Sequence, residues 1–182
     1  MDPDLSQLAN DRYEIADALH RYAFGLDHNH ADSLASVLTE DCRFDFRPAG
    51  RKLGLDFPLV TGRTEILDRV LPLIGPLQTS HSASNIQIEI AGDIATLSAY
   101  VMSQHFMPHN DPQRGKEFAL LMNRYDCELL RSTIAQSTET AETQRWQFRR
   151  ITIENAWFQG DPEILNASAS YHALRAKRAK KQ

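Results

Sequence analysis

The sequence is poor in features that mark several common classes of protein. Its 182 residues include only two cysteines, Cys42 and Cys127, which are too few for a disulfide framework and lack metal-ligand spacing. It has no apolar run of about 18 residues, the length that a membrane-spanning helix requires. Its first residues lack the basic and apolar segments of a signal peptide. These absences predict a cytoplasmic, reduced protein with no membrane partner.

The chain also lacks an excess of positive charge and any glycine-rich phosphate-binding motif. The net charge is −4, so no global field attracts nucleic acid or an anionic membrane. Basic residues gather only near the end, in a tail that we expect at 166–182 and interpret as solvated. The 42% hydrophobic and 24% charged residues are typical of a globular protein. We therefore expect a single domain at 1–165, large enough to enclose a cavity.

Helical periodicity characterises the first part of the chain. Apolar residues at three- and four-residue steps predict a helix from Leu5 to Leu26 with one buried face. Shorter helices are expected at about 31–38 and 63–75, the second kinked or shortened by Pro72. Between them the sequence predicts a strand at 42–46 and a loop at 47–62, which holds two prolines and three glycines.

Strand patterns follow. Two alternating runs around Gly92-Asp93 predict a β-hairpin, and further runs are expected at 118–132 and 144–158, with a polar loop at 133–143 between them. A short helix should start near Pro162. Helices followed by an antiparallel meander predict an α+β fold. A strongly curved sheet wrapped over the first helix would leave a cavity between the two.

The stretch TSHSASNIQIEI, residues 79–90, places a histidine near the start of a strand. Strict alternation would put His81 and Asn85 on one face and the isoleucines that follow on the other, against the main core. On the next strand, the face that starts with Ala95 is apolar at one end and finishes with Ser103 and His105. A polar patch beside apolar residues favours a cavity wall.

The first helix supplies chemical partners for His81. Tyr22 and Asp27 lie near its C-terminal end. A carboxylate beside an imidazole holds one tautomer and stabilises the imidazolium, and a tyrosine hydroxyl can donate a hydrogen bond to a carbonyl or a leaving hydroxyl. Asp27 also opens the run DHNH, but no third and fourth ligand has suitable spacing, so we expect no metal. These residues predict general acid–base chemistry without a metal or a nucleophile.

Three segments carry a specific resemblance: RYAFGLD at 21–27, HADSLASVLTEDCRFDF at 30–46 and TSHSASN at 79–85. With the meander, they resemble the SnoaL-like group of the NTF2-like superfamily from about Leu8 to Gly160. This group is similar to scytalone dehydratase and bile acid 7α-dehydratase. The resemblance implies a cone-shaped α+β barrel and a lyase that uses no cofactor.

The resemblance also implies roles for individual residues. His81 would be the base, Asp27 would orient it, and Tyr22 and His105 would polarise a carbonyl or help hydroxide to leave. The residues expected to contact the substrate are Asn85, Asn123, Tyr125 and Trp157. We thus predict a dehydratase that acts on a mostly apolar cyclic metabolite. An isomerase or cyclase with the same proton abstraction, or a non-catalytic ligand-binding or assembly module, stays open.

Because the exposed face of a curved sheet usually needs covering, we also expect a homo-oligomer. The resemblance to the SnoaL-like group implies a dimer or a trimer.

Overall fold

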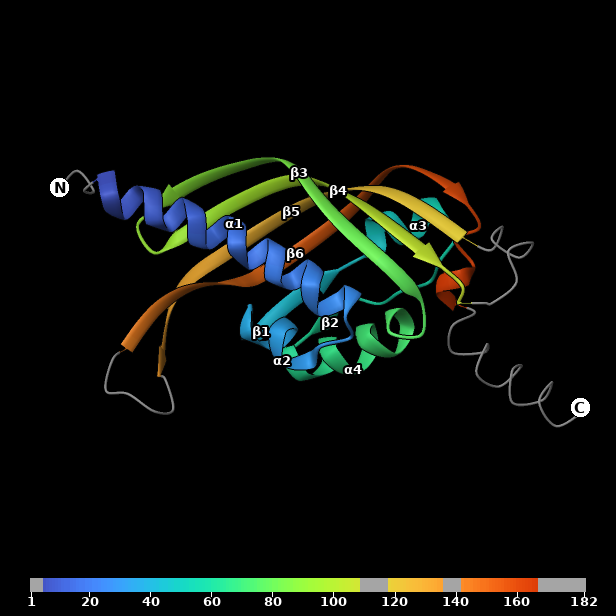
Figure 1. Cartoon of the computed structure of the whole chain (residues 1–182), viewed down its shortest axis with the longest axis horizontal. Helices are drawn as coiled ribbons and strands as arrows, with labels where there is room; N and C mark the ends of the chain where they lie inside the picture. Colours follow the sequence, from blue (N-terminus) through green and yellow to red (C-terminus); the bar gives the residue numbers. More distant parts are fainter. Residues whose placement is uncertain (1–4, 109–117, 136–141, 167–182) are drawn as a thin grey trace, which may run out of the picture.

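The protein folds as one curved sheet with helices packed against it (Figure 1). The computed structural model describes residues 5–108, 118–135 and 142–166. The elements in chain order are α1 (Leu5–Asp27), α2 (Ala31–Ser36), β1 (Leu38–Asp45), α3 (Arg47–Leu53), β2 (Val60–Thr61), α4 (Arg63–Ile74), β3 (Gln78–Ala91), β4 (Ile94–Phe106), β5 (Phe118–Ala135) and β6 (Glu142–Gly160). The α+β prediction is confirmed; the tail predicted at 166–182 falls almost entirely outside the described residues.

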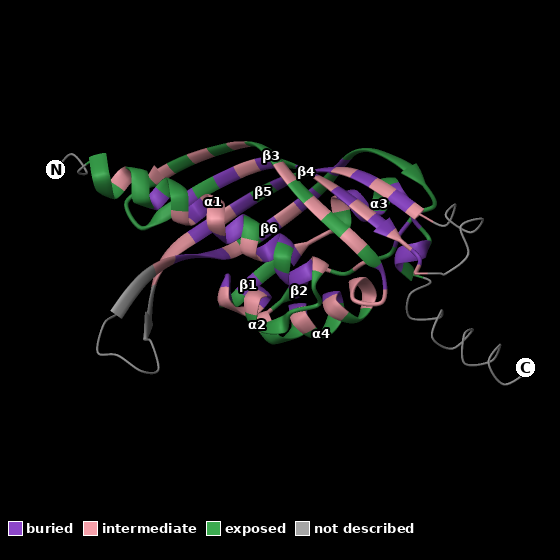
Figure 2. Ribbon diagram, in the orientation of Figure 1, coloured by how far each residue is buried: buried purple, intermediate pink, exposed green. Residues whose placement is uncertain are grey.

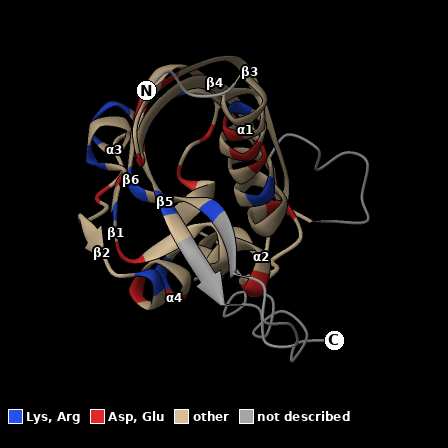
Figure 3. Ribbon diagram, turned by 90° about the vertical axis from the view of Figure 1, so that its left-hand side faces the viewer, with Lys and Arg blue, Asp and Glu red and all other residues tan. Residues whose placement is uncertain are grey.

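Six strands form the sheet in the order β2-β1-β6-β5-β4-β3. β1 runs parallel to β6, and the other neighbouring pairs are antiparallel. β3 to β6 form the predicted meander, with Gly92-Asp93 as the turn of the first hairpin. Since β2 and β3 lie at opposite ends of the order, the described sheet is an open curved surface. In the end-on view of Figure 3, β3 and β4 arch over α1, whose acidic and basic residues are clearly visible.

The apolar stripe of α1 faces the sheet. Ile15, Leu19, Tyr22 and Leu26 are buried at three- and four-residue steps, which confirms the predicted helix face. Leu5 was expected on this stripe but is 80% exposed, because the first turns of α1 extend beyond the packed region (Figure 2). Among the described residues, no helix is long and apolar enough to cross a membrane.

A buried ion pair fastens α1 to the β5–β6 hairpin. Asp11 accepts hydrogen bonds from both terminal nitrogens of Arg131, at 2.5 and 2.8 Å, and from Trp146 Nε1 at 3.0 Å. The Arg131 guanidinium also lies 4.6 Å from the Trp146 ring centroid and contacts the exposed Asp93 at 2.9 Å. Burial raises the pKa of Asp11, but the hydrogen bonds from Arg131 and Trp146 outweigh it and lower that pKa. The N-terminal half of α1 is therefore held by charge as well as by apolar packing.

The strand β3 departs from strict alternation at Asn85. Its pairing with β4 shifts there, and Asn85 has a left-handed φ of 53°. A bulge adds one residue to a strand and so reverses which face the following side chains take. Ile86, Ile88 and Ile90 consequently pack against the core on the same side as His81, while Asn85 is exposed. The prediction that His81 and the isoleucines face opposite ways is wrong.

The segment predicted as a loop, residues 47–62, contains α3 and β2, so that prediction is wrong. Pro48 lies in the first turn of α3, where a missing N–H breaks no helical hydrogen bond, and Gly54 ends the helix with a left-handed φ of 74°. Proline and glycine here mark the two ends of a short helix rather than exclude one.

The boundaries of the other helices and strands lie closer to the predicted ones. α4 continues two residues beyond Pro72, so the proline does not cut it short. β5 and β6 extend into the loop predicted at 133–143. After β6, backbone hydrogen bonds at 161–166 form the expected helical turn, with Pro162 near its start. This turn brings Leu165 against the core.

Candidate functional site

Asp27 ends α1 in a tightly packed turn. Gly25 lies so close to α2 that a Cβ there would be 2.9 Å from the backbone nitrogen of Leu34. His30 caps α2 by accepting a hydrogen bond at 3.1 Å from the first turn of that helix. Its own backbone N–H donates to the Gly25 carbonyl at 2.8 Å. These contacts reverse the chain and fix the end of α1, from which the Asp27 carboxylate reaches β3.

Asp27 and His81 form a hydrogen-bonded pair. Oδ1 of Asp27 lies 2.6 Å from Nδ1 of His81, and its Oδ2 accepts the His81 backbone N–H at 2.8 Å. The Thr79 hydroxyl donates to Oδ1 at 2.8 Å. The side chain of His81 is 5% exposed and that of Asp27 is 18% exposed. The structure thus brings the two predicted residues together, and Thr79 adds a partner that the sequence analysis missed.

The protonation states in this pair follow from its geometry. Burial raises the pKa of Asp27, but its hydrogen bonds with His81 and Thr79 outweigh that effect and lower it. Asp27 is therefore a carboxylate at neutral pH, which accepts hydrogen bonds and places a proton on Nδ1 of His81. In a neutral ring, Nε2 of His81 then carries the lone pair that can take up a proton.

His105 lies beside this pair. Its ring is 5.4 Å from the His81 ring in an edge-to-face arrangement, and the residue is 3% exposed. Burial, together with the nearby His81, lowers the pKa of His105 to about 3, although a hydrogen bond with the Ala119 backbone opposes the shift. Its Nδ1 has no hydrogen-bond partner among the described residues. His105 is therefore a neutral imidazole at physiological pH, with one nitrogen left to accept a hydrogen bond.

A polar network extends across β4, β5 and β6. The Asn155 amide donates to Asn123 Oδ1 at 3.0 Å, and the Asn123 amide donates to Ser103 Oγ at 3.3 Å. Ser103 is also hydrogen-bonded to Tyr125. Asn123 was predicted in the pocket, whereas Ser103 and Asn155 were not identified as site residues. Alternation with His105 could have identified Ser103, and alternation with Ile151 and Ile153 could have identified Asn155.

Two tyrosines form the floor of the site. Tyr22 and Tyr125 are 2% and 3% exposed, and their rings meet edge to face at 6.3 Å. Burial raises the pKa of both hydroxyls well above the usual value. Both are therefore neutral hydrogen-bond donors at physiological pH, which suits a developing oxyanion.

The rest of the pocket is apolar. It is partly open to solvent, and the empty space between its lining residues is about 390 Å³ with the adjoining solvent included. Besides His81, His105 and the polar side chains above, its lining consists of Leu26, Phe44, Phe46, Val70, Ile74, Leu121, Ile153 and Leu165. Such a lining lowers the local dielectric constant and so strengthens each hydrogen bond made against it.

Two predicted contact residues lie elsewhere. Asn85 is exposed at the β3 bulge, and Trp157 is 46% exposed on β6, so neither lines this pocket. The other histidines of the DHNH run have structural contacts: His28 packs on Phe24 with ring centroids 4.2 Å apart, and His30 caps α2. Of the eight predicted site residues, the structure gathers His81, Asp27, Tyr22, His105, Asn123 and Tyr125 around one pocket.

The low pKa of His105 predicts a measurable dependence of stability on pH. Between pH 6.5 and its folded pKa of about 3, the unfolded state binds a proton at this histidine that the folded state does not. The free energy of unfolding should therefore fall by about 2 kcal/mol from pH 6.5 to 4.5 on account of this group. Urea titrations of the wild type and His105→Asn at both pH values measure it. An equal pH dependence in the two proteins would contradict a neutral buried His105.

The chain matches the SnoaL-like domain family over residues 7–152 and therefore belongs to it; its architecture is the NTF2-like fold. It is 27% identical to the Terrestric acid biosynthesis cluster protein E of Penicillium crustosum, over 86% of this chain and 90% of that protein.

Two solved structures illustrate the shared fold. The Kfla4162 protein of Kribbella flavida superposes with a TM-score of 0.72 at 21% identity, covering 88% of this chain and 99% of its own. A candidate scytalone dehydratase of Novosphingobium aromaticivorans superposes with a TM-score of 0.67 at 22% identity, covering 86% and 91%. At these identities the likeness concerns the fold.

Proposed function

We propose that this protein is a cofactor-independent lyase that dehydrates a mostly apolar, cyclic hydroxy-carbonyl metabolite. The observation that carries the proposal is the hydrogen-bonded His81–Asp27 pair on the wall of an apolar pocket. A base held in one tautomer, beside neutral hydroxyl donors and away from bulk water, is suited to removing a proton from carbon.

Each side chain of the site has one role in the proposed reaction. Nε2 of His81 removes the proton from the carbon next to the carbonyl, and Asp27 stabilises the imidazolium that forms. The C–H electron pair gives an enolate, which the hydroxyl of Tyr22 or Tyr125 stabilises by hydrogen bonding. Collapse of the enolate forms the C=C bond and breaks the C–O bond, and the His81 imidazolium returns its proton to the departing hydroxide as water.

His105 receives a different role from the one first expected. A histidine with a pKa of about 3 holds no proton to give to a leaving group at neutral pH. Its unpartnered Nδ1 is instead suited to accept a hydrogen bond from the substrate hydroxyl. Together, His105 and the tyrosines would orient the substrate over His81.

The relative named for a biosynthesis cluster supports a place in secondary metabolism and a small-molecule substrate. A homo-oligomer stays a prediction, which light scattering of the purified protein tests. The exposed aromatic residues Tyr100, Trp157 and Phe158, on β4 and β6, support it because large apolar side chains on a sheet surface favour a partner.

The direct test of the proposed reaction uses β-hydroxytetralone, a bicyclic hydroxy-ketone whose dehydration yields fluorescent naphthol. We expect naphthol to form faster with enzyme than in buffer, with loss of the mass of water. A rearranged product of unchanged mass would show that the protein is an isomerase and not a dehydratase. If this compound and a panel of cyclic hydroxy-ketones bind tightly but none is converted, the result would contradict an enzymatic function and favour a ligand-binding module.

A further inference from the structure

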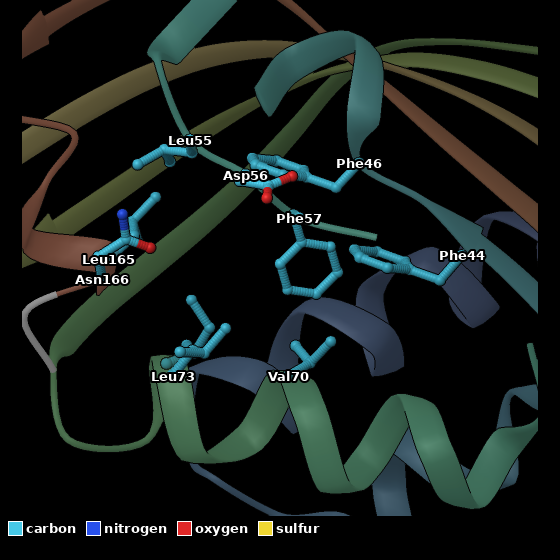
Figure 4. Close-up of a pocket in the computed structure, with 10 residues that line it drawn as sticks. Phe44, Phe46, Leu55, Asp56, Phe57, Val70, Leu73, Leu165 and Asn166 are labelled. Atoms are coloured by element: carbon cyan, nitrogen blue, oxygen red, sulfur yellow. The ribbon is translucent and has the colours of Figure 1, made fainter. Parts of the chain in front are cut away.

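We infer that a second, outer chamber binds an uncharged alkyl or aryl substituent of the substrate, while the reacting ring occupies the His81 pocket. The chamber is half open, and the empty space between its lining residues is about 490 Å³ with the adjoining solvent included. Figure 4 shows its side chains, which converge from the segment after β1, from α4 and from the turn after β6. The inference rests on the proposed function only for the chemistry of the reacting ring.

The two chambers adjoin each other. Five residues line both: Phe44, Phe46, Val70, Ile74 and Leu165. These side chains form the boundary between the His81 pocket and the outer chamber. One ligand can therefore contact His81 with its ring and reach the outer chamber with a substituent.

Aromatic edges and faces shape the outer chamber. The Phe57 ring lies 5.8 Å from the rings of Phe44 and Phe46, at interplanar angles of 80° and 79°. Phe44 and Phe46 are parallel at 6.5 Å. Phe57 itself is only partly buried, and Leu55 and Leu73 complete the wall. Rings that already pack on one another lose little conformational freedom when a ligand binds. This wall can therefore contact an apolar substituent at a small entropic cost.

The polar side chains of the lining set the charge of the substituent. They are Asp56 and Asn166, both exposed. Figure 4 shows the Asp56 carboxylate among the side chains that line the chamber. Among the residues that the structure describes, no lysine or arginine lines the chamber, so an anionic group there would meet the Asp56 carboxylate without a compensating cation from them. The substituent is therefore neutral and apolar.

A homologous series of ligands tests this assignment by binding alone. Acylated cyclohexanediones carry an acidic ring like the proposed enolate, and their acetyl, butanoyl, hexanoyl and octanoyl chains lengthen only the substituent. We expect the dissociation constant from calorimetry to fall about threefold per added methylene until the chamber is full. A terminal carboxylate on the octanoyl chain should remove most of this gain.

Two variants locate the effect. Leu73→Phe fills the outer chamber and should abolish the dependence on chain length, leaving the binding of the acetyl compound within about threefold. Asp68→Phe places the same ring on the exposed side of α4 and should behave like the wild type. Phe57→Ala enlarges the chamber and should move the best chain length upwards, a gain that misfolding cannot produce.

The outcomes separate this inference from the proposed reaction. Chain-length dependence that Leu73→Phe abolishes supports the chamber even if no compound is dehydrated. Three results would overturn the outer chamber, even if β-hydroxytetralone is dehydrated normally. They are an affinity that does not depend on chain length, a Leu73→Phe variant that loses the same affinity for every chain length, and an octanoyl compound that does not bind.

Discussion

Replacing His81 by asparagine is expected to lower the rate of β-hydroxytetralone dehydration by about a thousandfold, the usual range for loss of a general base. Asparagine retains a polar side chain of similar length but has no basic nitrogen. Stopped-flow or steady-state fluorescence of naphthol measures the loss, and circular dichroism shows whether the fold is kept.

Asp27→Asn should cost about a hundredfold or more by a different route. The new amide can donate to Nδ1 of His81, which moves the ring proton to Nε2 and leaves no lone pair facing the substrate. Thr79→Val removes one hydrogen bond to the same carboxylate and should cost only about tenfold.

His28→Asn is the matched control, because His28 follows Asp27 directly but is exposed and packs on Phe24. Its rate should equal that of the wild type. Comparable losses in His28→Asn and His81→Asn, or a His81→Asn protein that keeps full activity, would show that His81 is not the base.

The largest effect on stability is expected from Asp11→Ala. This change leaves Arg131 without its main partner and removes the acceptor of the Trp146 N–H, both in a buried setting. Breaking a buried ion pair by removing one side costs about 3 kcal/mol, and we expect that loss in the free energy of unfolding by urea.

Asp93→Ala is the control, since Asp93 contacts the same guanidinium but its side chain is 81% exposed. It should cost less than about 1 kcal/mol. The stabilisation from Asp11 should also weaken in acid: its pKa is lowered on folding, so its contribution is present above the unfolded value of 3.8 and is lost as pH falls through the folded value. Equal losses in the two variants would contradict the proposed role of Asp11.

Much of the fold could be predicted because long periodic segments dominate it. The stripe on α1 and the hairpin at Gly92-Asp93 depend on local spacing, and both are present in the structure. The short α3 does not follow from the sequence pattern, because proline and glycine are equally frequent in loops and at the ends of helices. The β3 bulge was missed because one extra residue depends on pairing with β4, which a single strand pattern does not record.

The candidate site, like the fold, could be predicted only in part from the sequence. Asp27 and His81 were identified from the motif, and both the chemistry of a carboxylate beside an imidazole and the family resemblance predicted that they lie together. Asn155 continues the inward alternation of Ile151 and Ile153, and Lys52 of α3 donates to its backbone carbonyl at 2.9 Å. The register shift that follows Asn155 turns Trp157 outward, which the strand pattern alone does not record. The outer chamber was also missed, since residues from β1, α4 and the turn after β6 form it only in three dimensions.

The central claim is that His81 removes a proton from carbon inside this pocket. Solvent deuterium exchange at the carbon next to the carbonyl of α-tetralone tests it most directly, because this ketone has no hydroxyl to lose and reports the first step alone. The account predicts exchange well above the buffer rate in the wild type and none above it in His81→Asn. Exchange that persists in His81→Asn, or that the wild type does not accelerate, would contradict it.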